Sequence, residues 1–197
     1  MTSQFVNIHT HRPTGSGIEL RTEGVHPWDA DMQLVATLGE RLSDAQAVGE
    51  TGLDFVHGPS REVQTETLRA QLRLARERGL PVVLHCVRAF EPLMRELAAC
   101  EPRAVIFHGF IGSPEQARRA LTKGYFLSFG ERAFASPKTL AALRETSLSQ
   151  LFLETDDSPV PIEEIYARAA EARGVPTEEL QRATLANYKR IFETQHG

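Results

Sequence analysis

One unit recurs along this sequence: a short apolar run that ends in a histidine, a carboxylate or a glycine, followed by a helix-like stretch. The apolar runs lie at residues 5–8, 18–25, 45–49, 80–84, 104–107, 125–129 and 151–153. Strands that are apolar throughout and alternate with helices are typical of a parallel sheet covered by helices. We therefore predict an α/β fold with about seven strands.

Six residues of types that commonly bind metal ions fall where these predicted strands end. They are His9, His11, Glu50, His85, His108 and Asp156. In a closed β/α barrel the carboxyl ends of the strands meet at one mouth, whereas in an open sheet they spread along an edge. The chain has 197 residues, fewer than the roughly 250 of a usual barrel. We therefore predict a TIM-like (β/α) barrel, reduced or distorted, forming a single domain over residues 1–197.

The first two histidines form half of a metal site. Alternate residues of a strand share one face, so His9 and His11 point the same way. We assign these two imidazoles and Asp156 to one divalent ion, together with Glu50. Asp156 is also the candidate general base that takes a proton from the attacking water.

Glu50 is predicted to bridge two ions, because a carboxylate offers one oxygen to each. His85 and His108 complete the second ion. Ion pairs roughly 3.5–4 Å apart activate water and stabilise the entering and leaving oxygens. Imidazole with carboxylate suits Zn, Mn or Fe more than a site selective for Mg alone. We predict a hydrolase domain with two divalent ions.

A set of motifs in a fixed order resembles the TatD family of metal-dependent hydrolases, itself similar to the amidohydrolase superfamily. The motifs are His9-Thr10-His11, Gly24-Val25-His26-Pro27, residues 49–54 (GETGLD), 80–85 (LPVVLH), 107–110 (FHGF), 125–130 (YFLSFG), 153–156 (LETD) and 187–192 (NYKRIF). They span nearly the whole chain. The resemblance implies a TIM-like barrel, two divalent metals and phosphodiester hydrolysis, typically of DNA. It also implies the metal ligands already chosen from the strand ends.

The sequence departs from the family pattern at several places. The acid usual two residues before the first histidine is Asn7. A strand–helix segment between His11 and Gly24 is missing, as is an Arg- and Asn-bearing loop near Val160. An extra acid, Asp157, follows Asp156. The predicted metal ligands are thus retained, while part of the substrate wall is absent.

Other residues receive supporting roles. Arg12, Arg88 and Arg132 each follow a strand end and are candidates to bind phosphate, because guanidinium matches its oxygens bidentately. The aromatic side chains of Trp28, Phe55 and Phe110 could stack a base or seal the barrel top, and we favour sealing.

Four further residues complete the interpretation of the site. His26 is interpreted as a supporting residue rather than a ligand, and Glu154 as an outer acid that tunes the site. Cys86 is expected to be a buried structural thiol. His57 and His196 are expected at the surface.

The net charge of −4 provides no basic field for a polyanion, so local arginines or metal ions must meet the phosphates of a nucleic acid. We see no signal peptide and no apolar run of membrane length. We therefore expect a cytoplasmic enzyme that acts on DNA or another phosphodiester, with no membrane association and no obligate protein partner.

Two alternatives keep the metals but change the function. The first is an amidohydrolase-type enzyme that cuts a C–N or ester bond of a small molecule and needs no phosphate-binding arginines. The second is a metal-binding scaffold without turnover. The chain retains all six predicted ligands, and histidines and carboxylates are costly to bury unpaired without a metal, which argues against the scaffold.

Overall fold

The computed structural model describes residues 4–193, which form two compact units. Unit 1 comprises the described residues up to Leu20 and those from His108 onward, and unit 2 comprises Arg21–Phe107. His196 lies outside the described residues. The prediction of a single domain stays a prediction.

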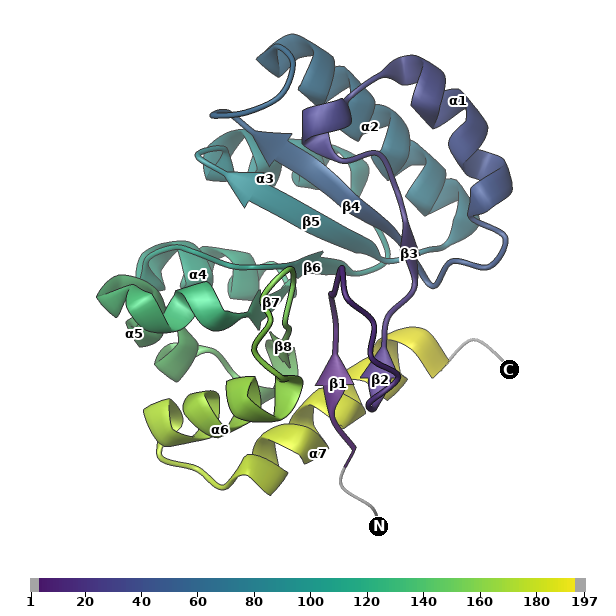
Figure 1. The fold of residues 1–197 in the computed structure, drawn as a ribbon. Coiled ribbons are helices and arrows are strands. Elements are labelled where there is room, and N and C mark those ends of the chain that lie inside the picture. Colours follow the sequence, from purple (N-terminus) through teal and green to yellow (C-terminus); the bar gives the residue numbers. More distant parts are fainter. Residues whose placement is uncertain (1–3, 194–197) are drawn as a thin grey trace. The chain divides into compact units, whose positions relative to one another are not determined.

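Unit 2 consists of parallel strands with helices packed against them (Figure 1). Its elements are β3 (Thr22–Glu23), the 3-10 turn η1 (Pro27–Asp29), α1 (Met32–Arg41), β4 (Ala47–Asp54), α2 (Arg61–Arg78), β5 (Val82–Val87), α3 (Phe90–Cys100) and β6 (Val105–Phe107). The strands pair in chain order, and α2 packs on β4 with α1 and α3 beside it. The β-α alternation predicted for this part is confirmed.

Unit 1 holds the two ends of the described chain. Its elements are β1 (Val6–Asn7), β2 (Ile18–Glu19), α4 (Pro114–Thr122), β7 (Phe126–Phe129), η2 (Glu131–Ala135), α5 (Pro137–Glu145), η3 (Leu148–Gln150), β8 (Leu151–Leu153), α6 (Ile162–Arg173), α7 (Thr177–Tyr188) and a final π turn, η4 (Lys189–Glu193). Strands β1 with β2, and β7 with β8, pair in parallel. The backbone after β1 then runs beside the residues after β8, which places two strand ends together.

Three sequence predictions are wrong in detail. The predicted strand at 18–25 is split, because β2 pairs with β1 whereas β3 pairs with β4, so eight strands occur among residues 4–193 rather than about seven. The sequence pattern predicts Asp29 as the cap of the first helix, but α1 is capped by Asp31, whose carboxylate accepts from Gln33 N, and Asp29 lies in η1. The pattern also predicts Thr177 as a cap, but Thr177 is the first helical residue of α7.

The apolar interior of each unit supports its strand ends. In unit 2, Val82, Val83 and Leu84 are fully buried just before His85. In unit 1, Leu151, Phe152 and Leu153 are fully buried just before Glu154. Burial on this scale is the main stabilising term of such a fold, and it fixes the strands whose ends carry the polar residues. Among residues 4–193, no helix combines the length and the apolar character that crossing a bilayer requires.

Candidate metal-binding clusters

A first cluster lies in unit 1, where the chain leaves β1 and β8. It comprises His9, His11, His108, Glu154 and Asp156. Backbone pairing aligns the two segments, since His11 N donates to Asp156 O at 2.9 Å and Asp156 N donates to His9 O at 3.1 Å. Asp156 has φ 54°, in the left-handed region that non-glycine residues seldom adopt, and its side chain lies next to the imidazoles.

Three donor atoms of this cluster converge. Nε2 of His9 lies 3.3 Å from Nε2 of His11, and Oδ1 of Asp156 lies 3.4 Å from Nε2 of His11 and 3.7 Å from Nε2 of His9. These atoms belong to one group whose candidate ligand atoms all lie within 4.8 Å of one another. Two imidazoles and one carboxylate at this spacing fit a divalent cation such as zinc, manganese or iron.

His108 and Glu154 extend the first cluster inward. The His108 ring lies 4.3 Å from the His9 ring, and its Nδ1 is 3.2 Å from Oε1 of Glu154. Glu154 is fully buried. Burial alone would raise the pKa of this carboxyl, but the His108 and His9 imidazoles lower it below its ordinary value. A buried carboxylate against an imidazole is the arrangement by which outer groups orient metal-binding histidines.

A second cluster lies in unit 2, on β4 and β5. It comprises His26, Glu50, Asp54 and His85. Glu50 and His85 lie within these strands, which continue to Asp54 and Val87, so the prediction that the strands end at Glu50 and His85 is wrong. Oε1 of Glu50 lies 2.7 Å from Nδ1 of His85 and 3.1 Å from Nε2 of His26. Glu50 stands where the register of β4 against β5 shifts, between Val48 and Thr51.

Glycine is required beside Glu50 for steric reasons. A Cβ atom on Gly52 would lie 2.0 Å from the carbonyl oxygen of His85, and Gly52 has φ 143°. A Cβ atom on Gly24 would lie 2.8 Å from the backbone of Gly49. Backbone segments therefore approach closely around Glu50, which the absence of a side chain at these glycines permits.

Asp54 is the residue of this cluster that the sequence interpretation did not assign. Its carboxylate is 1% exposed. Oδ2 lies 2.6 Å from Nε1 of Trp28 and 3.2 Å from Nε2 of His85, while Oδ1 accepts from the backbone N–H groups of Val56 and His57. Burial would raise the pKa of Asp54, but the hydrogen bonds from Trp28, Val56, His57 and His85 lower it well below its usual range.

The ionised Asp54 fixes the tautomer of His85. When Nε2 donates its hydrogen to Asp54, Nδ1 presents a lone pair toward the Glu50 carboxylate, and the two acceptors face each other at 2.7 Å. That contact requires a shared proton or a cation. The donor set of the second cluster therefore fits a metal ion, with Asp54 in the outer position typical of a carboxylate–histidine–metal arrangement.

His26 has the geometry of a supporting residue. Its Nδ1 accepts from the N–H of Trp28 at 3.1 Å, so in the neutral ring the hydrogen sits on Nε2 and points to Glu50. This agrees with the role that the sequence suggested. The structure thus gathers His9, His11, His108 and Asp156 in one cluster, and Glu50 with His85 in the other. The six-ligand set, with Glu50 as the bridge, stays a prediction.

The three predicted phosphate-binding arginines are all exposed. Arg12 and Arg132 belong to unit 1, and Arg88 follows β5 in unit 2 with φ 50°. NH2 of Arg132 lies 3.9 Å from Oδ1 of Asp157, a loose ion pair between two exposed side chains. Their exposure is compatible with a phosphate contact, and their role stays a prediction.

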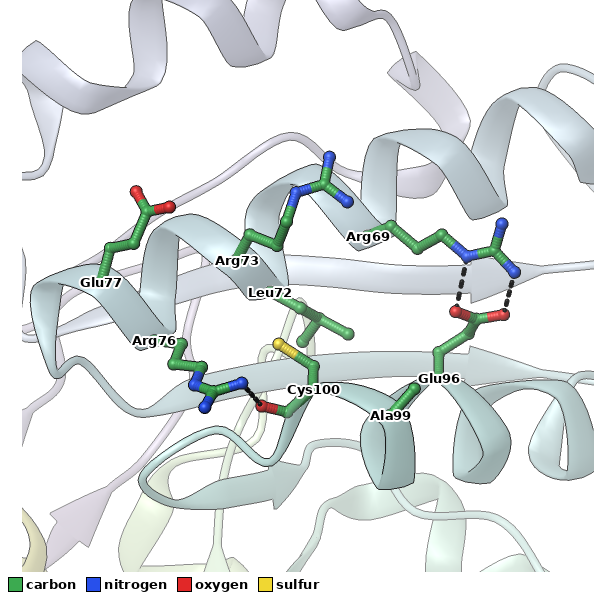
Figure 2. A pocket seen from close by; sticks show the side chains of 8 residues that line it. All are labelled: Arg69, Leu72, Arg73, Arg76, Glu77, Glu96, Ala99 and Cys100. Carbon is green, nitrogen blue, oxygen red and sulfur yellow. Dashed lines mark hydrogen bonds and ion pairs between the residues drawn. The ribbon is translucent and has the colours of Figure 1, made fainter.

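A separate arginine-rich groove of about 620 Å³ lies between α2 and α3 (Figure 2). Arg69 makes a bidentate pair with Glu96, at 2.7 and 2.8 Å, and NH1 of Arg76 donates to the carbonyl of Cys100 at 3.3 Å. These contacts join the two helices. The groove contains neither of the two clusters, and two of its arginines serve helix packing.

Two of the candidate aromatic side chains, Phe110 and Trp28, differ in their exposure. Phe110 is 6% exposed and packs edge-on against Phe129, which is the sealing role that we favoured. Trp28, in contrast, is 51% exposed, so the prediction that it seals the top is wrong. Its indole N–H is drawn to Asp54, which leaves a large part of the ring outside.

Parallel strands followed by helices, with imidazole–carboxylate clusters on the strands or just after them, are the features of a metal-dependent α/β hydrolase. A family model described as "TatD related DNase" matches residues 19–193. The chain therefore belongs to the TatD family of metal-dependent hydrolases, which confirms the resemblance inferred from its motifs.

Individual relatives agree with this assignment. The chain is 33% identical over 177 residues to the uncharacterized metal-dependent hydrolase YjjV of Escherichia coli K12, covering 81% of this chain and 68% of that protein. It is 32% identical over 201 residues to the 3'-5' ssDNA/RNA exonuclease TatD of Pantoea ananatis, covering 87% and 76%. The crystal structure of the E. coli homologue YjjV matches with a TM-score of 0.78 at 28% identity, over 89% of this chain and 77% of that one. The predicted TIM-like (β/α) fold class is thus confirmed.

Proposed function

We propose that this TatD-family hydrolase cleaves phosphodiester bonds of DNA, using water activated by two divalent metal ions. The facing acceptors of Glu50 and His85, 2.7 Å apart, are the observation that carries the proposal, because a cation bound between β4 and β5 would satisfy both. The names of the matched family and of the Pantoea relative support a nucleic-acid substrate.

Each cluster offers donors for one ion. In unit 1 these are His9, His11 and Asp156. In unit 2 Glu50 and His85 converge with His26, to which we assign the supporting role. The predicted set adds His108 to the ion held by His85. Bound ions would supply a water of lowered pKa and a positive charge for the phosphate oxygens.

The protein's own groups orient the site and move the proton. Asp54 holds His85 through Nε2, and His26 donates to Glu50, so both proposed ligands are fixed before substrate arrives. The Asp156 carboxylate is 24% exposed, and this leaves it accessible to a water molecule. We assign the proton transfer from that water to Asp156.

The departure at Asn7 has a structural account that leaves the chemistry in place. Asn7 is 3% exposed, its Nδ2 donates to Oγ1 of Thr155 at 2.9 Å, and its Oδ1 accepts from Thr155 N at 3.0 Å. The amide thus ties β1 to the segment that carries Asp156. An amide can serve as donor and acceptor at once, which an ionised acid at this position cannot do.

The test measures hydrolysis of bis-p-nitrophenyl phosphate and of end-labelled single-stranded DNA. Protein freed of metal would be loaded with Mn²⁺, Zn²⁺ or Mg²⁺ and compared with a chelated sample. Metal-dependent cleavage of both substrates is expected, and Glu50→Ala should abolish it while the exposed Glu77→Ala leaves it intact. Metal-loaded protein that cleaves neither substrate would contradict the proposal, and a screen of amides and lactones would follow.

A further inference from the structure

Trp28 presents an aromatic face to solvent beside the second cluster. The residue is 51% exposed, and its neighbours Val56 and His57 are also exposed, at 51% for Val56 and 60% for the His57 side chain. Exposed apolar and aromatic side chains beside a few polar groups are the composition typical of a ligand site.

The indole is held rigidly in this exposed position. Nε1 donates to Oδ2 of the buried Asp54 at 2.6 Å, and the backbone N–H of Trp28 donates to Nδ1 of His26. Gly58 lies so close that a Cβ atom there would be 2.8 Å from Cα of Trp28. An aromatic surface fixed in advance loses little conformational entropy when a flat ligand stacks on it.

The loop that flanks the indole is also ordered. Nε2 of Gln64 donates to the carbonyls of Asp54, His57 and Pro59, at 2.8 to 3.0 Å. His57 lies beside the indole, with ring centroids 5.3 Å apart and planes at 54°, and its Nδ1 is 3.3 Å from Oδ2 of Asp54. The His26 ring also packs against the indole, with centroids 4.9 Å apart and planes at 86°, and Trp28 remains 51% exposed in the corner formed by these rings.

This corner lies directly beside the proposed ligands. Trp28 is linked to Glu50 through Asp54 and His85, and the centroids of the Trp28 and His85 rings are 6.2 Å apart. A ligand stacked on Trp28 therefore places the groups attached to it near the second cluster. In a nucleotide, the group attached to the base through the sugar is the phosphate.

We propose that Trp28, with His57 beside it, stacks the nucleobase adjoining the scissile phosphate. This inference rests on the proposed phosphodiesterase function and assigns the position of its substrate. Stacking on an aromatic face tolerates every base, so Trp28 selects a nucleotide over a simple phosphodiester without reading the sequence. It also supplies affinity from a part of the substrate that the metal ligands do not touch.

Tryptophan emission offers a direct test, because Trp28 is the only tryptophan in the sequence. Metal-loaded protein would be titrated with a phosphorothioate decathymidylate, which resists hydrolysis, and with an abasic phosphorothioate strand of equal length and charge. A dye on each strand reports binding by anisotropy. We expect the thymidylate to quench the Trp28 emission and the abasic strand to bind without quenching.

A pair of variants isolates the ring face. Trp28→Phe and Trp28→Leu both lose the N–H bond to Asp54, but only the first keeps an aromatic face. A stacked base contributes about 1–3 kcal/mol, so the leucine variant should bind the thymidylate roughly 5- to 150-fold more weakly than the phenylalanine variant. The two variants should bind the abasic strand equally, with equal metal content.

The possible outcomes distinguish the stacking role of Trp28 from the proposed phosphodiesterase function. Equal thymidylate affinities of the two variants, or a bound thymidylate with unchanged emission, would overturn the stacking role while wild-type cleavage of DNA stands. A wild type that neither binds nor cleaves the unmodified strand would overturn both.

Discussion

Nδ1 of His85 lies 2.7 Å from Oε1 of Glu50, although both atoms are acceptors once Nε2 of His85 donates to Asp54. Two acceptors at this distance repel each other unless a proton or a cation lies with them. The contact between Glu50 on β4 and His85 on β5 is therefore satisfied by a shared proton or by a bound cation.

Replacing Glu50 tests this arrangement. Glu50→Ala should lose at least one equivalent of bound metal and lower hydrolysis by more than about 100-fold, which exceeds the effect usual for an outer residue. Metal would be counted by mass spectrometry after dialysis against a fixed concentration. Glu77→Ala, on the exposed face of α2, is the control. Wild-type metal content in the Glu50 variant would disprove the ligand role.

Asp54→Asn should weaken metal binding without removing a ligand. The amide no longer fixes His85 with a charge, and losing such an outer carboxylate typically costs roughly 10–100-fold in metal affinity. Isothermal titration with Zn²⁺ would measure the change. The exposed Asp44→Asn serves as the control. An unchanged affinity for Zn²⁺ would mean that Asp54 only stabilises the loop at 55–60 and does not orient His85.

The same carboxylate should make stability depend on pH. The pKa of Asp54 is lowered in the folded chain, so its contribution is complete above the unfolded pKa of about 3.9 and is lost as the pH falls through the folded value. Metal-free wild type should therefore lose more unfolding free energy between pH 6 and pH 3 than metal-free Asp54→Asn. Urea-induced unfolding of both proteins at pH 6 and at pH 3 measures this difference. Equal losses in both proteins would contradict it.

Gly52→Ala should destabilise the fold and the second cluster together. The backbone conformation costs about 1–3 kcal/mol for a side-chain residue, and the added Cβ would also displace the His85 carbonyl. Gly79→Ala is the matched control, because φ is positive there too but nothing lies within 4 Å of an added Cβ. Chemical unfolding should show the larger loss at Gly52, together with weaker metal binding. Equal losses at the two glycines would show that the clash is relieved easily.

The two thiols should differ in reactivity. Burial raises the pKa of the Cys86 thiol to about 12, so at pH 8 it remains protonated in the native protein. Burial also raises the pKa of Cys100, though Arg76 and Arg73 oppose that shift. Labelling with a disulfide reagent at pH 8 should modify Cys100 first and Cys86 only on unfolding. Rapid native labelling of Cys86 in a Cys100→Ser variant would refute this.

Much of the site was predictable because strand geometry is regular. The two-residue period of a strand placed His9 and His11 on one face, and the apolar run at 151–153 coincides with β8. These inferences need only local pattern. The ends of β4 and β5 were not predictable in this way, because both strands continue past the polar residues Glu50 and His85.

The contacts of Trp28 and Asp54 could not be predicted in the same way. They depend on a short 3-10 turn at Pro27–Asp29 and on a loop at 55–60, whose paths follow from hydrogen bonds to Gln64 and His26. The periodicity of apolar residues in the sequence gives no information about such hydrogen bonds. The same limitation explains why Asp29 was chosen over Asp31 as a cap, since both are acids directly before an apolar helix pattern.

Titration of Mn²⁺ into metal-free protein, with bound ions and bis-p-nitrophenyl phosphate hydrolysis followed together, tests the central claim most directly. We predict that two ions bind per chain and that hydrolysis rises as the second is taken up. Hydrolysis that is equally fast in chelator, or two bound ions with no cleavage of this ester or of DNA, would contradict the account.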